Sequence, residues 1–326
     1  MSEVRIGLGR PVAAAAAAVV LSLTASGCVT VHGELEIVPT TTKAQAARAL
    51  DTFVTAYNKA DEKYDRTADA KYVTGALGAI DAAKLKAGRA VDPQGNPNYK
   101  PLELTDSHFT IPKKAGWPRW FVTDSANNRV TDSRWVMVFT RDDVDEPWAV
   151  SYLTVFHGNT LPKFKKDADG WAEAVAADDD KLAMRPADLS KKYAAYLKDG
   201  GDGFAAGPYT SEWRAARKKN ATRPGLATQF IDEPLTSGDY APLALRTEDG
   251  GALVFFVTRR YEKQTAFAGS DLPAISPSVK ALMTGDAKQS VTYGFVSNQT
   301  ALVGSGTGEG VQVLNRVEGI TTAEGS

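Results

Sequence analysis

The chain has 326 residues, and its 38 lysine and arginine residues nearly balance 39 aspartate and glutamate residues. Because there is no basic excess to neutralise phosphates, nucleic acid is not an expected partner. Cys28 is the only cysteine, so an internal disulfide, thiol catalysis and a zinc–thiolate site are excluded for the rest of the chain. Apolar residues make up 43% of the sequence, which is typical of globular proteins with a buried core.

The N-terminal residues have the parts of a secretory signal. Arg5 and Arg10 supply positive charge, and an apolar segment follows over residues 12–23. This segment is shorter than the roughly 20 apolar residues that a membrane-spanning helix needs. Small residues then lead to Cys28. The pattern predicts a signal peptide over residues 1–27.

The sequence Ala25-Ser26-Gly27-Cys28 resembles the lipobox of bacterial lipoproteins, with Ala25 where that motif prefers leucine. The resemblance implies that Cys28 receives a diacylglyceryl group and becomes the first residue of the mature protein. Two acyl chains on one residue give a stable membrane anchor. We therefore expect a protein held at the extracytoplasmic face of the cell membrane, with a tether over residues 28–42. The alternative is that Cys28 is only a small residue in a signal peptide cut elsewhere.

The first half of the mature chain, residues 43–170, is predicted to contain helices followed by strands. Apolar residues recur at helical spacing from about residue 42, and a second helical stretch covers about 68–86. A loop rich in proline and glycine follows at 92–97. Short aromatic and β-branched segments then predict three strands, at residues 120–123, 134–140 and 148–156.

The second half, residues 180–320, repeats this order. Pro186 suits the first turn of a helix, and another helix is expected over about 211–219. Strands are predicted at 252–259, 289–296 and 311–317. An insertion over about 262–288 contains a short helix at 277–283, and residues 321–326 form a tail.

A short sequence similarity favours an internal repeat, because residues 99–104 and 240–245 share the pattern Y-x-P-L-x-L. We predict an α+β fold with two tandem halves, each with helices packed on a curved antiparallel sheet. This order is similar to the nuclear-transport-factor-2-like or cystatin-like fold used twice. The chain also resembles actinobacterial lipoproteins of uncharacterised families, and neither resemblance implies a catalytic residue.

Asp106 and His108 are the candidate pocket residues. In a regular strand from Leu102 they would share one face. If that face lined a cavity, the two side chains could form an acid–base pair. The alternative, favoured by turn chemistry, is that residues 105–107 form a turn and leave both side chains in water.

An acidic cluster occurs between the second and third predicted strands. Its oxygen ligands could suit a hard cation, but calcium loops are longer and contain a glycine for their sharp turn. A solvated hairpin tip explains the cluster better, and we predict no metal and no cofactor. The cluster consists of Asp142, Asp143, Asp145 and Glu146.

Three functions remain open. The leading hypothesis is a non-enzymatic binding or scaffolding module of the cell envelope, attached to the membrane by its lipid and contacting an envelope protein. The second is a lipoprotein that binds a small apolar ligand in a cavity lined by tryptophan and tyrosine. The third is a hydrolase or isomerase that uses Asp106 and His108.

Overall fold

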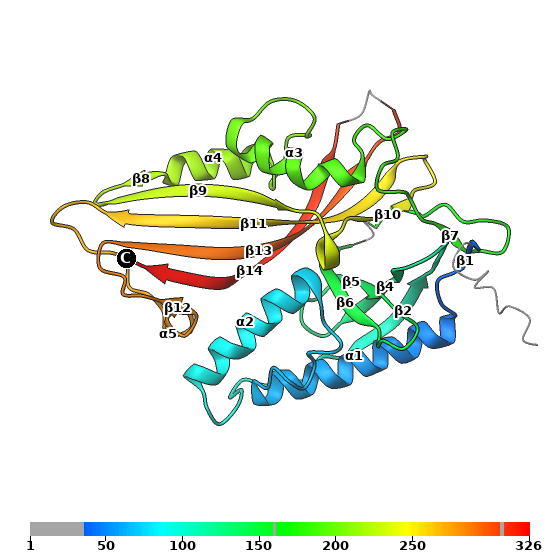
Figure 1. Ribbon diagram of the computed structural model, residues 1–326, viewed down its shortest axis with the longest axis horizontal. Helices are drawn as coiled ribbons and strands as arrows, with labels where there is room; N and C mark the ends of the chain where they lie inside the picture. Colours follow the sequence, from blue (N-terminus) through cyan, green and yellow to red (C-terminus); the bar gives the residue numbers. More distant parts are fainter. Residues whose placement is uncertain (1–35, 159–160, 307–309) are drawn as a thin grey trace, which may run out of the picture.

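The computed structural model describes residues 36–158, 161–306 and 310–326 (Figure 1). The predicted signal peptide, Cys28 and most of the tether lie outside the described residues. Helices and antiparallel sheets are both present, which confirms the α+β class. Among the described helices, none combines the length and apolar character needed to cross a membrane.

The first half contains two long helices followed by a four-stranded antiparallel sheet in the order β2-β4-β5-β6. The first helix begins after Thr42, whose hydroxyl caps the backbone N–H of Gln45 at 3.2 Å. The elements are β1 (Val38–Pro39), α1 (Lys43–Lys63), α2 (Gly75–Val91), β2 (Leu104–Thr110), β3 (Pro112–Lys114), β4 (Arg119–Asn127), β5 (Ser133–Arg141), β6 (Ala149–His157) and β7 (Ala172–Glu173).

The second half also has two helices before its main strands, and its larger sheet has the order β12-β14-β13-β11-β9-β8. A short strand, β10, pairs with the beginning of β11. The elements are α3 (Pro186–Asp199), α4 (Ser211–Asn220), β8 (Thr222–Arg223), β9 (Leu226–Leu235), the 3₁₀ helix η2 (Gly238–Tyr240), β10 (Leu243–Arg246), β11 (Ala252–Ala266), α5 (Pro277–Lys280), β12 (Met283–Thr284), β13 (Ser290–Val303) and β14 (Gln312–Gly325).

The two sheets share an apolar core. Side chains alternate along each strand, so every second residue of β4 and β11 points into this core. Trp120 and Val122 of the first sheet belong to the same buried cluster as Phe255 and Val257 of the second. Each such buried side chain contributes on the order of 1.5–3 kcal/mol of hydrophobic stabilisation. The halves are therefore held together by a continuous core.

Helices cover the faces of the sheets that point away from this core (Figure 1). On α1, Phe53 meets Phe139 of β5 edge to face, with ring centroids 5.9 Å apart. On α3, Tyr193 meets Phe256 of β11 in the same way at 5.6 Å. The central layers are thus helix, sheet, sheet and helix, and α2 runs across β6 and β14 at the seam.

A ligand cavity lined by tryptophan and tyrosine was one alternative, and the described residues between the two sheets are instead closely packed. Trp120 and Tyr152 point into the shared core and are at most 2% exposed. The side chains on this side pack against the other sheet and give no support to the predicted apolar ligand site there. The sequence pattern could not reveal this packing, since strands covered by a helix or by a second sheet have the same alternation.

The ends of the described chain pair with neighbouring strands. The described end of the tether is part of the fold: β1 pairs with β3, and the Thr40 hydroxyl donates to the Trp120 carbonyl at 2.6 Å. The predicted tail at 321–326 continues β14, and the Ser326 N–H donates to the Ser290 carbonyl at 2.9 Å. The three strands predicted in each half are confirmed, although β11, β13 and β14 extend well beyond their predicted ends.

The two segments that share the Y-x-P-L-x-L pattern do not occupy equivalent positions in the two halves. Leu104 opens β2 and pairs with Asn127 at the end of β4. Leu245 lies in β10 and pairs with Leu253 near the beginning of β11. This short similarity therefore carries no weight for an internal repeat.

Candidate functional site

The loop 64–74, which joins α1 to α2, meets η2 of the second half. The Thr74 hydroxyl donates a hydrogen bond to Asp239 Oδ2, and the Thr74 N–H donates to the Val150 carbonyl at 2.9 Å. Gly75 follows with φ +52°, and a Cβ there would lie 2.5 Å from the Asp239 carbonyl oxygen. Glycine is required at this position because the two backbones approach so closely.

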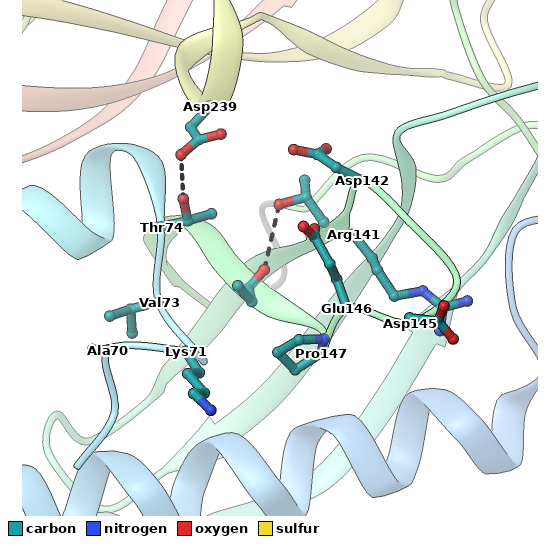
Figure 2. Close-up of a pocket in the computed structure, with 12 residues that line it drawn as sticks. Ala70, Lys71, Val73, Thr74, Arg141, Asp142, Asp145, Glu146, Pro147 and Asp239 are labelled. Atoms are coloured by element: carbon teal, nitrogen blue, oxygen red, sulfur yellow. Dashed lines mark hydrogen bonds between the residues drawn. The ribbon is translucent and has the colours of Figure 1, made fainter. Parts of the chain in front are cut away.

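A hollow of about 490 Å³ opens beside this contact, between the loop, the β5–β6 hairpin and η2 (Figure 2). We call it the acidic hollow. In the view of Figure 2, the carboxylates of Asp142 and Glu146 lie across the space from Asp239. The charged side chains that line it are four acids and two bases: Asp142, Asp145, Glu146, Asp239, Lys71 and Arg141.

Arg141 does not neutralise the centre of the acidic hollow. Its guanidinium carbon lies 4.8 Å from the Trp148 ring centre, and Nη1 donates to the Val144 carbonyl at 3.2 Å. In Figure 2 this guanidinium is turned away from Asp239 and lies near Asp145. The hollow therefore keeps an excess of negative charge in its interior.

A second hollow of about 260 Å³ adjoins the first and shares Val73 and Thr74 with it. We call it the carboxyl-pair hollow, because Asp69 of the loop and Asp81 of α2 both line it. Asp69 is 2% exposed and Asp81 is 3% exposed. Within the described residues, Oδ2 of each carboxyl group is buried with no hydrogen-bond partner.

The two carboxyl groups perturb each other's protonation. Burial raises the pKa of Asp69 to about 8, and the charge of Asp81 adds to the effect. Burial also raises the pKa of Asp81. Lys84 does not compensate fully, since its Nζ lies 2.6 Å from Oδ1 of Asp61. Two neighbouring buried carboxylates cannot both ionise at low cost, so the pair keeps a proton at neutral pH.

The two hollows together form what we call the junction groove. Carboxyl groups from both halves line it, two of them buried, and they outnumber the three cations of the lining, Arg66, Lys71 and Arg141. This arrangement attracts positive charge and supplies several separated hydrogen-bond acceptors. It suits an organic cation such as an amine or a guanidinium, whose donors are spread over more than one atom. In the described ranges, no three histidine, aspartate or glutamate side chains converge as metal ligands.

Asp106 and His108 lie elsewhere, on the exposed edge of the first sheet. The register of β2 shifts between Thr105 and His108, and Asp106 has φ +47°. Their side chains are 65% and 64% exposed. The structure thus places them in water on an irregular part of β2 and not in a cavity; the predicted alternative of a turn over residues 105–107 agrees in their exposure, although the segment is a strand.

The Asp106–His108 pair is held by Arg134. Its Nη1 donates to Asp106 Oδ2 at 2.9 Å, and its Nη2 lies 3.0 Å from His108 Nδ1. His108 Nε2 is 3.6 Å from Asp106 Oδ1. These contacts form a surface network in which the Arg134 guanidinium is in hydrogen-bonding contact with Nδ1 of His108. The geometry gives no support to the predicted acid–base role.

The acidic hairpin was expected to be a solvated tip, and its four acids are indeed exposed. Sequence reasoning missed that Asp142, Asp145 and Glu146 also line a hollow. Asp143 does not line it; its carboxylate accepts the Asp145 N–H at 3.1 Å. The hollow depends on the loop and on η2, which are distant in sequence.

The buried carboxyl pair was also missed, although one signal existed. Asp81 lies between Leu77 and Leu85 on the buried stripe of α2, where an unpaired charge is unusual. No comparable signal marks Asp69, which lies in a turn, or Asp239 in η2. Cys28, the predicted lipidation site, lies outside the described residues.

Comparison with known proteins agrees with the lipobox interpretation. The chain is similar to an uncharacterized lipoprotein of Streptomyces coelicolor, with 59% identity over 95% of this chain and 94% of the relative. An uncharacterized lipoprotein of Streptomyces avermitilis is also 59% identical, over 97% of this chain and 96% of the relative. A second S. coelicolor lipoprotein is 26% identical over 90% of this chain and 88% of its own length. No solved structure matches the chain.

A family match covers nearly the whole described structure. Residues 37–325 match the domain of unknown function DUF8094, from β1 to the last residue of β14. With this match and two relatives at 59% identity over almost their full length, the chain belongs to the DUF8094 family of lipoproteins.

Proposed function

We propose that this protein binds a positively charged organic ligand in the junction groove while its lipid anchor holds it at the extracytoplasmic face of the cell membrane. Binding, and not turnover, is its role. The observation that carries the proposal is the meeting of carboxylates from both halves around one hollow, which adjoins a second hollow lined by a buried carboxyl pair.

Two observations support the lipid anchor. Ala25-Ser26-Gly27-Cys28 resembles a lipobox, and relatives that are 59% identical over almost their whole length are lipoproteins. The first strand that the structure describes, β1, begins at Val38, ten residues after Cys28 in the sequence. With the predicted tether this short, the lipid anchor holds the protein near the membrane surface.

The groove is suited to reversible binding. Its hairpin acids are exposed, so a cation can reach them without first breaking buried ion pairs. The buried pair in the adjoining hollow keeps a proton at neutral pH, and a cation bound beside it would favour release of that proton. A charged donor also forms a strong hydrogen bond with an ionised carboxylate.

We also infer that the two halves are versions of one helix-plus-sheet unit of nuclear-transport-factor-2-like or cystatin-like type. The support is their shared order of two helices before antiparallel strands, with the spatial orders β2-β4-β5-β6 and β9-β11-β13-β14. In this view the junction groove is created by joining the units, because Asp239 comes from one unit and Asp142 from the other.

Isothermal titration of the detergent-solubilised full-length protein with agmatine tests the binding proposal. Agmatine is a suitable probe because amine and guanidinium groups lose their protons only at about pH 10 and above. The double variant Glu146→Gln/Asp239→Asn should weaken binding about tenfold, since each lost ion pair contributes on the order of 0.2–1 kcal/mol. The asparagine introduced at position 239 retains an acceptor for Thr74, so the junction is preserved.

The matched control is Asp143→Asn, which removes the same charge from the same hairpin but does not line the acidic hollow. It should bind agmatine within about twofold of the wild type. Equal affinities for the wild type and the double variant would refute the proposal. Chemical conversion of the ligand by the protein would refute its non-enzymatic part.

A further inference from the structure

A third hollow, lined mainly by positively charged side chains, lies on the side of the larger sheet that faces α3 and α4. It has a volume of about 570 Å³ and is bounded by the end of α3, by α4 and by β9. We call it the α4 hollow. It shares no lining residue with the junction groove, so anything inferred for it is independent of the function proposed above.

Four cations and one carboxylate line the α4 hollow. The carboxylate, Asp232, is already neutralised: Arg217 Nη2 donates to its Oδ1 at 2.9 Å, and the second guanidinium nitrogen donates to Oδ2. The other three cations have no ion-pair partner in the described part of the chain. They are Lys198, Arg214 and Lys218, and together they leave the hollow strongly positive.

Three buried polar atoms in the lining lack partners. Nε of Arg214, Nε of Arg217 and the hydroxyl oxygen of Thr228 make no hydrogen bond within the described residues. Arg217 is 7% exposed and Thr228 is 4% exposed, so water does not freely reach them. Buried donors without acceptors are rare in folded proteins and point to a missing partner.

Arg214 is also held in place. Its guanidinium carbon lies 5.3 Å from the centre of the Tyr196 ring. On another side it packs against Gly200, which has φ +80° and where a Cβ would lie 2.7 Å from Nη1. A planar guanidinium fixed in this way presents a rigid fork of donors, which matches the two oxygens of a carboxylate or phosphate.

Helix dipoles explain only part of this arrangement. Lys198 and Lys218 lie in the last turns of α3 and α4, where cations are generally favourable. Arg214 lies in the first half of α4, where this effect does not operate. The dipole also leaves the unpaired donors of Arg217 and Thr228 unexplained.

We infer that the α4 hollow is a binding site for an oxyanion, carried as a carboxylate or phosphate group on a small molecule or a lipid headgroup. Arg214 presents its fork of donors to two of the oxygens. Thr228 donates its hydroxyl from the strand side. Lys198 and Lys218 balance the remaining charge at the rim.

The test is titration of the full-length protein in a non-ionic detergent, at constant ionic strength, with three probes. Inorganic phosphate and citrate represent free oxyanions, and short-chain phosphatidylglycerol represents a lipid headgroup. Binding of phosphate or citrate assigns a soluble ligand, and binding of phosphatidylglycerol alone assigns a lipid. Either result supports the site, and absence of binding by all three probes at millimolar concentration overturns it.

Variants locate the binding. Arg214→Gln should weaken it about tenfold by removing the charged fork, and Thr228→Val about threefold by removing one neutral donor. Lys219→Gln is the matched control, because it removes a charge from the same helix outside the lining; its affinity should stay within about twofold. Equal weakening by Arg214→Gln and Lys219→Gln would show non-specific attraction and refute the site.

Arg214 also packs against neighbours, so Arg214→Lys takes the place of Arg214→Gln if the melting temperature of the glutamine variant falls. Lysine keeps the charge but loses the planar fork. It should bind more weakly than the wild type and more tightly than Arg214→Gln. Unchanged affinity in both Arg214→Lys and Thr228→Val would contradict the assigned donors.

Discussion

Thr74 and Asp239 are 165 residues apart in the chain, and the threonine hydroxyl donates a hydrogen bond to the aspartate carboxylate across the junction of the two halves. The same carboxylate lines the acidic hollow. A single contact therefore fixes the loop 64–74 against η2 and positions one of the charges proposed to hold the ligand. Stability of the junction and ligand binding should depend on each other.

Removing this hydrogen bond should loosen the junction. We predict that Thr74→Val lowers the free energy of unfolding by about 1–2 kcal/mol, because hydrogen bonds to charged groups contribute about this much. Urea denaturation measures the change. Thr55→Val is the control, since the Thr55 hydroxyl only donates to Asp51 within α1 at 2.9 Å. Equal midpoints for Thr74→Val and the wild type would contradict the role of this contact.

Gly75 should tolerate no side chain. Gly75→Ala combines a left-handed backbone with a Cβ placed 2.5 Å from the Asp239 carbonyl oxygen, and it should cost about 2–4 kcal/mol. Gly170→Ala is the matched control, because Gly170 has φ +84° but no atom within 4 Å of the added Cβ. Thermal unfolding should show a larger loss for Gly75→Ala. Equal losses would mean that backbone strain alone matters and that the close approach does not.

The sequence predicted the local elements well because their signals are local. The segments that form β4, β5 and β6 are rich in aromatic and β-branched residues, which predict strands, and Pro186 marks the beginning of α3. β9 was missed, since its apolar and polar residues come in pairs and do not alternate, and Pro234 lies near its end. α2 begins at Gly75 instead of near residue 68, because residues 65–72 form turns before it.

The site was less predictable because it depends on long-range packing. Asp69 and Asp81 meet only when the turns of the loop fold back onto α2, and Asp239 reaches the adjoining acidic hollow from the other half. Asp106 and His108 were chosen by strand alternation, and a bulge in β2 removed that regularity. A charged residue in an apolar stripe, as at Asp81, was a better signal than the presence of a histidine.

Asp69 should make the protein less stable as the pH rises. Its pKa in the folded state is about 8, above the ordinary value of 3.8, so the folded protein keeps a proton that the unfolded chain releases. The stabilising contribution is complete below about pH 4 and is lost as the pH rises toward 8. Asp69→Asn should reduce this slope by up to about 1.4 kcal/mol per pH unit.

Urea denaturation at several values between pH 5 and pH 8 checks this slope, and Asp65→Asn serves as the control. Hydrogen bonds from Thr67 lower the pKa of Asp65, so its contribution is lost only at acidic pH. The Asp65 variant should therefore keep the slope of the wild type across this range. A slope unaffected by Asp69→Asn would contradict the shared proton of the carboxyl pair.

Cys28 should carry the anchor. Cys28→Ser should abolish labelling with radioactive fatty acid and move the protein from the membrane fraction to the soluble fraction, because no acyl chain can then be attached by a thioether. The matched control is Ser26→Ala, which keeps a small residue before the sulfur and should remain membrane-bound. Continued fatty-acid labelling of Cys28→Ser would show that the lipid is attached to another residue, and it would refute Cys28 as the anchor.

The most direct test of the central claim is a crystal structure of the protein soaked with agmatine. Our account predicts density in the acidic hollow, with a guanidinium or ammonium nitrogen within hydrogen-bond distance of Glu146 and Asp239. An empty hollow at saturating agmatine, or agmatine bound only at other places on the surface, would contradict it.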